Sequence, residues 1–145
     1  MPIPQPGLIA NGTIYPSTFI MLNPALVAPA GFQALQCTAN GRMIGIAFEG
    51  TEQPPLPSST YPLPAATNGN SVPWYANGQS PVLLKIGSTA VVAGQRLTSD
   101  SNGYGTPMAT TGYPQNVGAT ALESAPAGAL CRVQVDIFAS VATVT

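Results

Sequence analysis

Residues 129–138, which read ALCRVQVDIF, are the stretch that decides the fold. Apolar β-branched residues occupy every second position from Val133 to Ile137, and Arg132, Gln134 and Asp136 occupy the polar positions around them. Alternation with a period of two is the pattern of a β-strand that has one face on an apolar core and the other in solvent. The sequence therefore predicts a half-buried strand here.

Strand and turn signals continue toward the N-terminus. Residues 82–86 alternate in the same way, with Val82, Leu84 and Ile86 on one side, and residues 89–92 also favour a strand. Turn residues separate these segments, as in the DSNG of residues 100–103 and the PAG of residues 126–128. Short strands with frequent turns predict an all-β protein built as a small barrel or a sandwich.

A hairpin signal lies in residues 32–49. Asn40-Gly41 readily takes positive φ at both central turn positions, and it stands between two apolar, partly alternating runs. We expect these two runs to pair with each other. The same five-residue spacing separates Leu35 from Asn40 and Leu97 from Asn102, but this similarity is too short to predict a duplication.

The first 30 residues differ from the rest because they are rich in proline and carry no charge. Proline fixes φ and removes a backbone donor, so the segment is expected to be an extended N-terminal arm with short strand pieces. Its apolar cluster, residues 18–22, has two interpretations: a first strand of the chain's own sheet, or an arm laid across a neighbouring subunit. In the second case, a chain without residues 1–22 keeps a folded core.

Residues from about 50 to 80 read as a long loop rich in Pro, Ser and Asn. Trp74 and Tyr75 interrupt this loop, either as aromatic side chains packed back on the chain's own core or as an exposed anchor for a partner. The predicted organisation is therefore an arm at residues 1–30 and a single β-domain at residues 31–145 that contains this loop.

Composition narrows the function. The 145 residues carry only four Lys or Arg and five Asp or Glu, with no His, and the net charge is −1. No basic stripe is present that could neutralise phosphates or an anionic membrane, so nucleic acid and membranes are not expected partners. No apolar run approaches the roughly 20 residues of a membrane span, and the first residues do not read as a secretory signal. A nearly uncharged surface favours association with other proteins.

Catalysis and metal binding are not expected. Histidine, the commonest general base, is absent, and no two carboxylates are paired by spacing, so we predict no enzyme activity and no cofactor. Cys37 and Cys131 are far apart in sequence, and Cys131 reads as a small buried hydrophobe rather than a disulfide partner or reactive thiol. Asp100 reads as a turn residue that binds backbone N–H groups, because the glutamate that ends a calcium loop is missing.

The runs VVAGQRL at residues 91–97, VGATALE at 117–123 and RVQV at 132–135, with the turns between them, resemble the C-terminal β-domain of tailed-bacteriophage capsid decoration proteins, also called cement proteins. The similar part is residues 80–140. The resemblance implies a small β-barrel or β-tulip, a homotrimer, and a place on the exterior of a virion capsid after synthesis in the host cytoplasm. It implies the major capsid protein as partner, with neighbouring capsid subunits bridged and the shell stabilised.

The residues proposed to contact partners come from the apolar cluster and the long loop: Phe19, Ile20, Leu22, Trp74 and Tyr75. An alternative function is a head-fibre or tail-surface β-module that binds host glycan. Such a module should present aromatic side chains in a groove, and the candidates for this role are Trp74, Tyr75, Tyr104 and Tyr113.

Overall fold

The computed structural model describes residues 2–24, 33–53, 62–109 and 115–140, and this part of the chain contains strands and no helix. The all-β prediction is confirmed. No helix long and apolar enough to span a membrane occurs among these residues. The strands are β1 (Gln5–Ala10), β2 (Phe19–Leu22), β3 (Gln33–Gln36), β4 (Met43–Ala47), β5 (Ser71–Tyr75), β6 (Val82–Lys85), β7 (Arg96–Ser99), β8 (Gly105–Pro107), β9 (Gln115–Ala121) and β10 (Leu130–Ser140).

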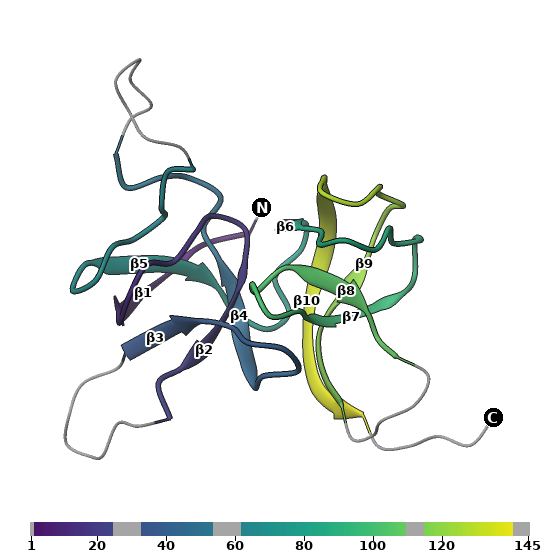
Figure 1. Ribbon diagram of the computed structural model, residues 1–145, viewed down its shortest axis with the longest axis horizontal. Coiled ribbons are helices and arrows are strands. Elements are labelled where there is room, and N and C mark those ends of the chain that lie inside the picture. The colour runs from purple at the N-terminus through teal and green to yellow at the C-terminus, as the bar shows by residue number, and fades with distance from the viewer. Residues whose placement is uncertain (1, 25–32, 54–61, 110–114, 141–145) are drawn as a thin grey trace.

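Strands β1 to β5 form a closed barrel in the order β1-β3-β2-β4-β5, on the left of Figure 1. The pair β1 and β3 is parallel, and the other pairs are antiparallel. A five-stranded barrel has a narrow interior, and four alanines help to fill it beside larger side chains. This core consists of Leu8, Ala10, Ile14, Ile20, Ala34, Ala47, Ala66 and Val72.

Strands β6 to β10 form a second sheet in the order β6-β10-β9-β7-β8, on the right of Figure 1. The alternating residues 130–138 belong to β10, which pairs with both β6 and β9. Val133 and Val135 are buried, whereas Arg132 and Gln134 are exposed, as the alternation predicts. A single parallel bridge between Ile86 and Gly105 links the two outer strands, so this sheet also curls toward closure.

The second sheet repeats the topology of the barrel. Taken in chain order, β6 to β10 have the same neighbours and directions as β1 to β5, including the parallel contact between the first and third strands. The bridge Ile14↔Ala66 has its counterpart in Val91↔Ala125. Registers also correspond: Leu8↔Val72 with Leu84↔Cys131, Leu22↔Ala34 with Ser99↔Gly105, and Ile46↔Tyr75 with Thr120↔Gln134.

One connection differs strongly between the two halves. Residues 48–70 join β4 to β5 in the barrel, whereas residues 122–129 join β9 to β10 in the second sheet. Near its end, each connection has a glycine with positive φ, Gly69 in the barrel and Gly128 in the second sheet. The Gly69 N–H donates to the Ala10 carbonyl, and the Gly128 N–H donates to the Ile86 carbonyl. The extra length of the barrel connection therefore lies before this shared turn.

The two halves share one apolar cluster. Phe19, Met43, Ile46 and Tyr75 from the barrel are buried in the same cluster as the core of the second sheet. Hydrogen bonds also cross the junction, from Phe19 N–H to the Gly103 carbonyl and from other backbone groups nearby. The barrel and the second sheet are therefore packed together rather than tethered by a linker.

The predicted hairpin between residues 32–36 and 43–48 is wrong in its pairing. Both strands exist, but β2 lies between β3 and β4 and pairs with each of them. Asn40 takes the expected positive φ of 51°, yet Gly41 does not. The turn is held by the second sheet instead, because Asn116 donates to both the side chain and the carbonyl of Asn40. The connection therefore passes across β2 rather than folding β3 directly onto β4.

The first described segment differs from the expected extended arm. Residues 5–10 and 19–22 are β1 and β2, so the apolar cluster is a strand of the chain's own barrel, the first of its two interpretations. The prolines fit because they stand where no ladder hydrogen bond is needed. Pro2 and Pro4 precede β1, Pro24 follows β2, and Pro6 lies where the β1 register shifts.

Two further expectations change. The loop predicted for residues 50–80 contains β5, which closes the barrel between β1 and β4; its residues 54–61 lie outside the described part. The strand expected at residues 89–92 is reduced to the bridge at Val91.

Asp100 is the turn residue that the sequence indicated, since its carboxylate accepts from the N–H groups of Asn102 and Tyr104 at 2.8 and 3.0 Å.

Candidate functional site

The residues proposed to contact partners are divided between core and surface. Phe19 and Ile20 have no exposed surface, and Tyr75 is buried. Trp74 is partly buried and packs against the barrel core, while Leu22 has 45% of its surface exposed. The first three side chains stabilise this chain's own fold, so contact with a partner is left to Leu22 and the accessible part of Trp74.

Tyr75 is held by a polar contact at the edge of the shared core. Its hydroxyl donates a 2.7 Å hydrogen bond to Glu49, and its ring lies 6.1 Å from that of Phe48. Burial, together with the hydrogen bond and the negative charge of Glu49, raises the pKa of Tyr75 well above its usual range. The aromatic pair predicted for a partner anchor is thus split, with Tyr75 inside the molecule.

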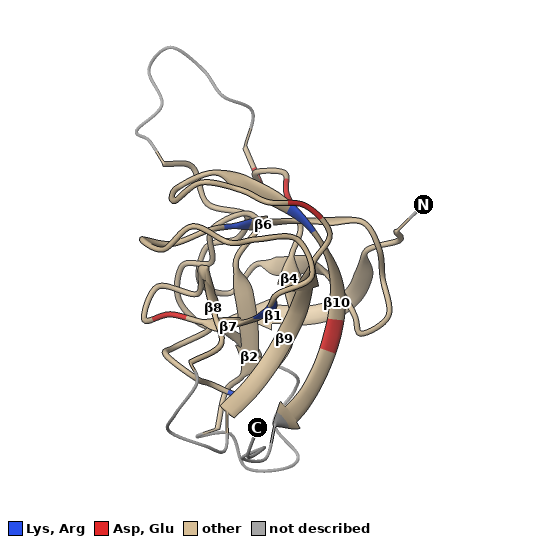
Figure 2. Cartoon of the chain, turned by 90° about the vertical axis from the view of Figure 1, so that its right-hand side faces the viewer, with Lys and Arg blue, Asp and Glu red and all other residues tan. Residues whose placement is uncertain are grey.

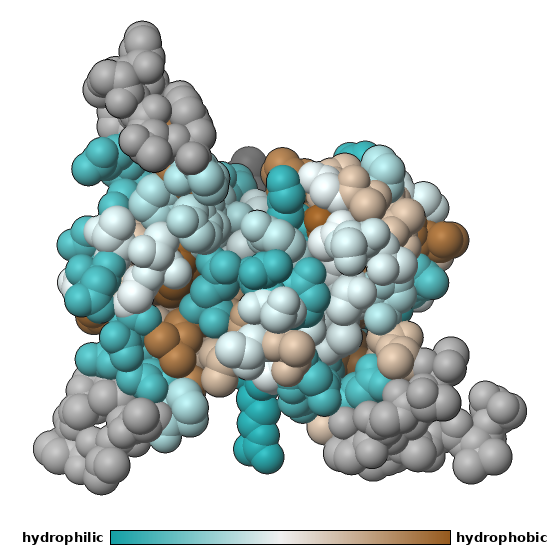
Figure 3. All heavy atoms as spheres, in the orientation of Figure 1, coloured by the Kyte–Doolittle hydropathy of each residue, from teal (hydrophilic) through white to brown (hydrophobic). Residues whose placement is uncertain are grey.

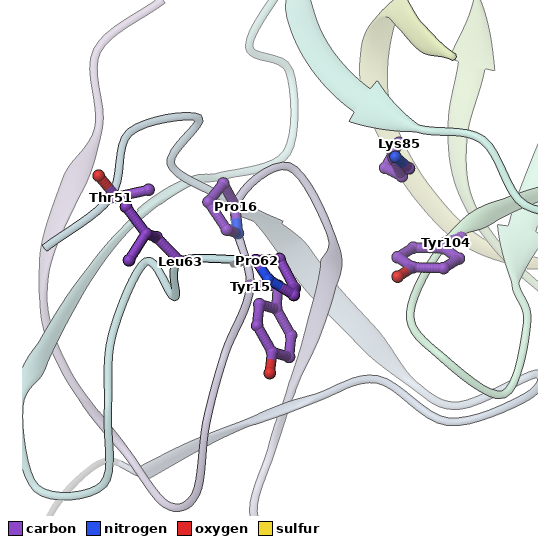
Figure 4. A pocket seen from close by; sticks show the side chains of 7 residues that line it. All are labelled: Tyr15, Pro16, Thr51, Pro62, Leu63, Lys85 and Tyr104. Atoms are coloured by element: carbon purple, nitrogen blue, oxygen red, sulfur yellow. The ribbon is translucent and has the colours of Figure 1, made fainter. Parts of the chain in front are cut away.

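A pocket of about 450 Å³ lies where the barrel meets the second sheet. A volume of this size falls within the range of small-molecule sites, roughly 300–1,000 Å³. In Figure 4, the barrel residues stand on one side and Lys85 and Tyr104 on the other. The pocket is lined by Tyr15, Pro16, Thr51, Pro62, Leu63, Lys85 and Tyr104.

Backbone hydrogen bonds hold both walls of this pocket. The Tyr15 N–H donates to Gln36 Oε1 at 2.8 Å on the barrel side. The Lys85 N–H donates to the carbonyl of Ser17 at 2.7 Å, which ties the end of β6 to the turn that carries Tyr15. Asp100 fixes the turn of Tyr104 from the other side. The side chains of Tyr15, Lys85 and Tyr104 therefore start from hydrogen-bonded backbone.

Among the polar side chains of the pocket, the Thr51 hydroxyl donates to the Gln53 carbonyl at 2.6 Å, whereas three others have no partner in the described residues. Within the described residues, the Tyr15 and Tyr104 hydroxyls and the Lys85 ammonium form no hydrogen bond or ion pair. The ion pair recorded in this part of the chain joins Arg132 to Glu123 at 2.8 Å, on the surface of the second sheet. Figure 2 shows the few charged residues spread over the molecule, and none of the carboxylates in the described residues pairs with Lys85.

Cys37, Cys131 and Glu123 have structural contacts in the described part of the chain. No group of three Cys, Asp or Glu that could hold a metal occurs in residues 2–24, 33–53, 62–109 and 115–140. Cys37 and Cys131 are free and buried, and burial raises the pKa of both thiols. The hydrogen bonds from Arg132 lower the pKa of Glu123. Each of these groups has a structural environment rather than a reactive one.

The surface carries isolated apolar side chains. Figure 3 shows a face that is mainly hydrophilic or neutral, with small hydrophobic areas. Val92, in the turn before β7, and Leu130, at the start of β10, have 59% and 50% of their surface exposed. The exposed large apolar side chains of the described residues are Ile3, Ile9, Leu22, Val92, Leu122 and Leu130.

Among the tyrosines and the lysine that line the pocket, the sequence indicated only Tyr104. Tyr104 was among the aromatic candidates for a groove, whereas Tyr15 and Lys85 were not, and Tyr113 lies outside the described residues. Tyr15-Pro16 is a turn dipeptide just before β2, and Lys85 ends β6. A tyrosine on a turn and a lysine at a strand end can each be recognised in the sequence as candidate binding residues. Only the packing of the two halves brings them to the same pocket.

The fold and the site define a small all-β protein of two joined five-stranded units with a pocket at their junction. No protein-family model matches the sequence, and no curated protein matches it. Among solved structures, the chain is similar to the N base of head fiber gp8.5 of bacteriophage phi29, with a TM-score of 0.57 and 15% sequence identity. The similarity covers 94% of this chain and 95% of that one, so both units take part in the shared fold.

Proposed function

We propose that this chain is a structural component of a bacteriophage virion, placed on the exterior of the head. The observation that carries the proposal is the similarity of fold to a head-fibre base over almost the whole of both chains. A match of that extent spans both the barrel and the second sheet rather than a single common sheet. The decoration-protein resemblance of residues 80–140 supports the same location.

The finer proposal is that the protein cements neighbouring major capsid subunits as a homotrimer. A surface with nine charged residues in 145 relies little on charge attraction, so its contacts should be apolar and main-chain contacts that resist salt. Exposed apolar side chains on both halves, such as Leu22 and Val92, supply contact area. A structural role also fits a chain without histidine, in which catalysis has no obvious base.

Co-sedimentation with undecorated heads, at low and high salt, tests this function, after light scattering has given the oligomeric state. A trimer that sediments with the heads at both salt concentrations supports cementing. A Leu22→Ser and Val92→Ser double variant should bind less, with Ile3→Ser as a control for apolar surface elsewhere. A protein that remains in the supernatant at both salt concentrations contradicts head attachment.

A second candidate function is a head-fibre or tail-surface module that binds host glycan. The pocket at the junction favours it, because Tyr104 and Tyr15 line a cavity of ligand size together with a free lysine. This function does not require the protein to bridge capsid subunits. An assay of sugar binding by the isolated protein, in the absence of heads, tests this function independently of cementing.

A further inference from the structure

The pocket lies between the two halves, but part of its wall comes from a connection that is long only in the barrel. Thr51, Pro62 and Leu63 belong to the β4–β5 connection, residues 48–70, whereas the corresponding β9–β10 connection is residues 122–129. The turns before β2 and β7 are equivalent, since each follows a matching bridge and each contains a positive φ, at Ser17 and at Gly94. The pocket is therefore additional to what the fold itself needs.

The equivalent turns also differ in side chains. Tyr15 and Pro16 follow the bridge residue of the barrel, whereas Val92 and Ala93 follow the bridge residue of the second sheet. Both turns keep the same backbone form, so the tyrosine is not required for the turn. Its ring instead forms one side of the junction pocket, across from Tyr104.

The free groups of the pocket indicate the chemistry of a ligand. Tyrosine rings offer flat apolar faces together with hydroxyls that donate and accept hydrogen bonds. The Lys85 ammonium offers three donors and a positive charge with no partner in the described residues. A ligand that satisfies all of them has an apolar ring face, hydroxyls at its edge and a negative group.

We propose that the pocket binds an acidic saccharide, a pyranose that carries a carboxylate. The C–H face of the sugar ring lies against Tyr15 or Tyr104, its hydroxyls bond the tyrosine hydroxyls, and its carboxylate pairs with Lys85. The proposal rests on the second candidate function and names its ligand class. It does not depend on attachment to a head, because the isolated protein contains every residue of the site.

The ligand is tested by amide NMR titration of the full chain with three probes: methyl glucuronoside, methyl glucoside and acetate. We expect methyl glucuronoside to shift the amides of Tyr15, Lys85 and Tyr104 in a saturable way, with a dissociation constant of about 1 mM, as for a weak single-site contact. Methyl glucoside should bind about tenfold more weakly, because one charge-assisted hydrogen bond is lost. Acetate should cause no saturable shift.

Variants test the roles of the side chains. Lys85→Met should weaken binding of methyl glucuronoside about tenfold and leave that of methyl glucoside unchanged, because only the charged contact is lost. Tyr104→Ala should weaken both sugars. Arg42→Met is the matched control, since it removes one positive charge from a different cavity beside Phe138. Unchanged spectra elsewhere in the chain verify that each variant is folded.

Three results overturn the proposal. The first is no saturable shift at the pocket amides with methyl glucuronoside. The second is equal affinity for the two sugars, which removes Lys85 from recognition. The third is an acetate response equal to that of methyl glucuronoside, which shows a simple anion site. None of these results affects co-sedimentation with heads, so failure of the saccharide site and failure of head attachment are distinguishable.

Discussion

Phe19 provides the sharpest test of how the N-terminal segment is used. If residues 18–22 formed an arm that acts on a neighbouring subunit, replacement of Phe19 would leave the stability of the isolated chain unchanged. In the structure, Phe19 lies on β2, has no exposed surface and belongs to the cluster that joins the two halves. Its ring also faces the backbone of β9, where a Cβ on Gly118 would lie 2.5 Å from Phe19 Cε1.

The expected cost of Phe19→Ala follows from this environment. Truncation of a buried phenylalanine to alanine costs about 3–5 kcal/mol, and the upper part of that range applies where neighbours cannot fill the cavity. Backbone on the β9 side cannot move in to do so. With a cost of about 4–5 kcal/mol and a urea m-value of about 2 kcal/mol/M, the unfolding midpoint should fall by about 2–2.5 M.

Urea unfolding followed by far-UV circular dichroism and by Trp74 fluorescence measures this change. Leu22→Ala is the matched control, because it truncates an apolar side chain of the same strand that is 45% exposed, and should cost about 1 kcal/mol. A midpoint change for Phe19→Ala below about 0.5 M, or no larger than that for Leu22→Ala, would refute the barrel assignment of β2 and restore the arm.

Further predictions concern the junction, pH and the thiols. Gly118→Ala should destabilise the fold by about 1–3 kcal/mol in the same urea assay, because the new methyl group overlaps the fixed ring of Phe19. The raised pKa of Tyr75 means that the folded state keeps the phenol proton, so stability should fall as pH rises above about 10, and Tyr75→Phe should remove this part of the slope in pH-dependent thermal melts. Cys37 and Cys131 should react with a thiol reagent only after unfolding, since both are buried and their pKa values are raised; rapid labelling of the native chain would contradict this.

Alternation of apolar and polar residues predicted the strands best where one face of the strand is buried and the other is exposed to solvent. In β10 this condition holds from Cys131 to Val135, and the predicted faces are the observed ones. β2 lacks it, because Phe19 and Ile20 are both buried, one in the shared cluster and the other inside the barrel. A strand that is buried on two sides has no polar face. The sequence alone therefore did not determine whether this strand belongs to the chain's own sheet or to a neighbouring subunit.

Pairing was harder to predict than the strands themselves. Asn40-Gly41 does mark a turn, but a local signal fixes only the reversal of the chain and not what enters between its arms. Here β2 occupies that space and forms backbone hydrogen bonds with both β3 and β4. The pocket could not be predicted from the sequence for the same reason. Tyr15 and Lys85 lie in one pocket only because the two halves pack against each other.

The repeated topology explains why two such different sequences can follow one plan. The eight core residues of the barrel have structural counterparts in Leu84, Ile86, Val91, Leu97, Gly105, Ala121, Ala125 and Cys131. Leu97 corresponds by register to Ile20, and not to Leu35 as the spacing to Asn-Gly suggests.

What is repeated is therefore burial at fixed positions of the ladder, which any small or medium apolar residue can provide. Residues outside that pattern are free to differ, and the largest difference is the β4–β5 connection. Because the fold does not need that connection to be long, its length and the side chain of Tyr104 across the pocket are the features on which the proposed saccharide site rests.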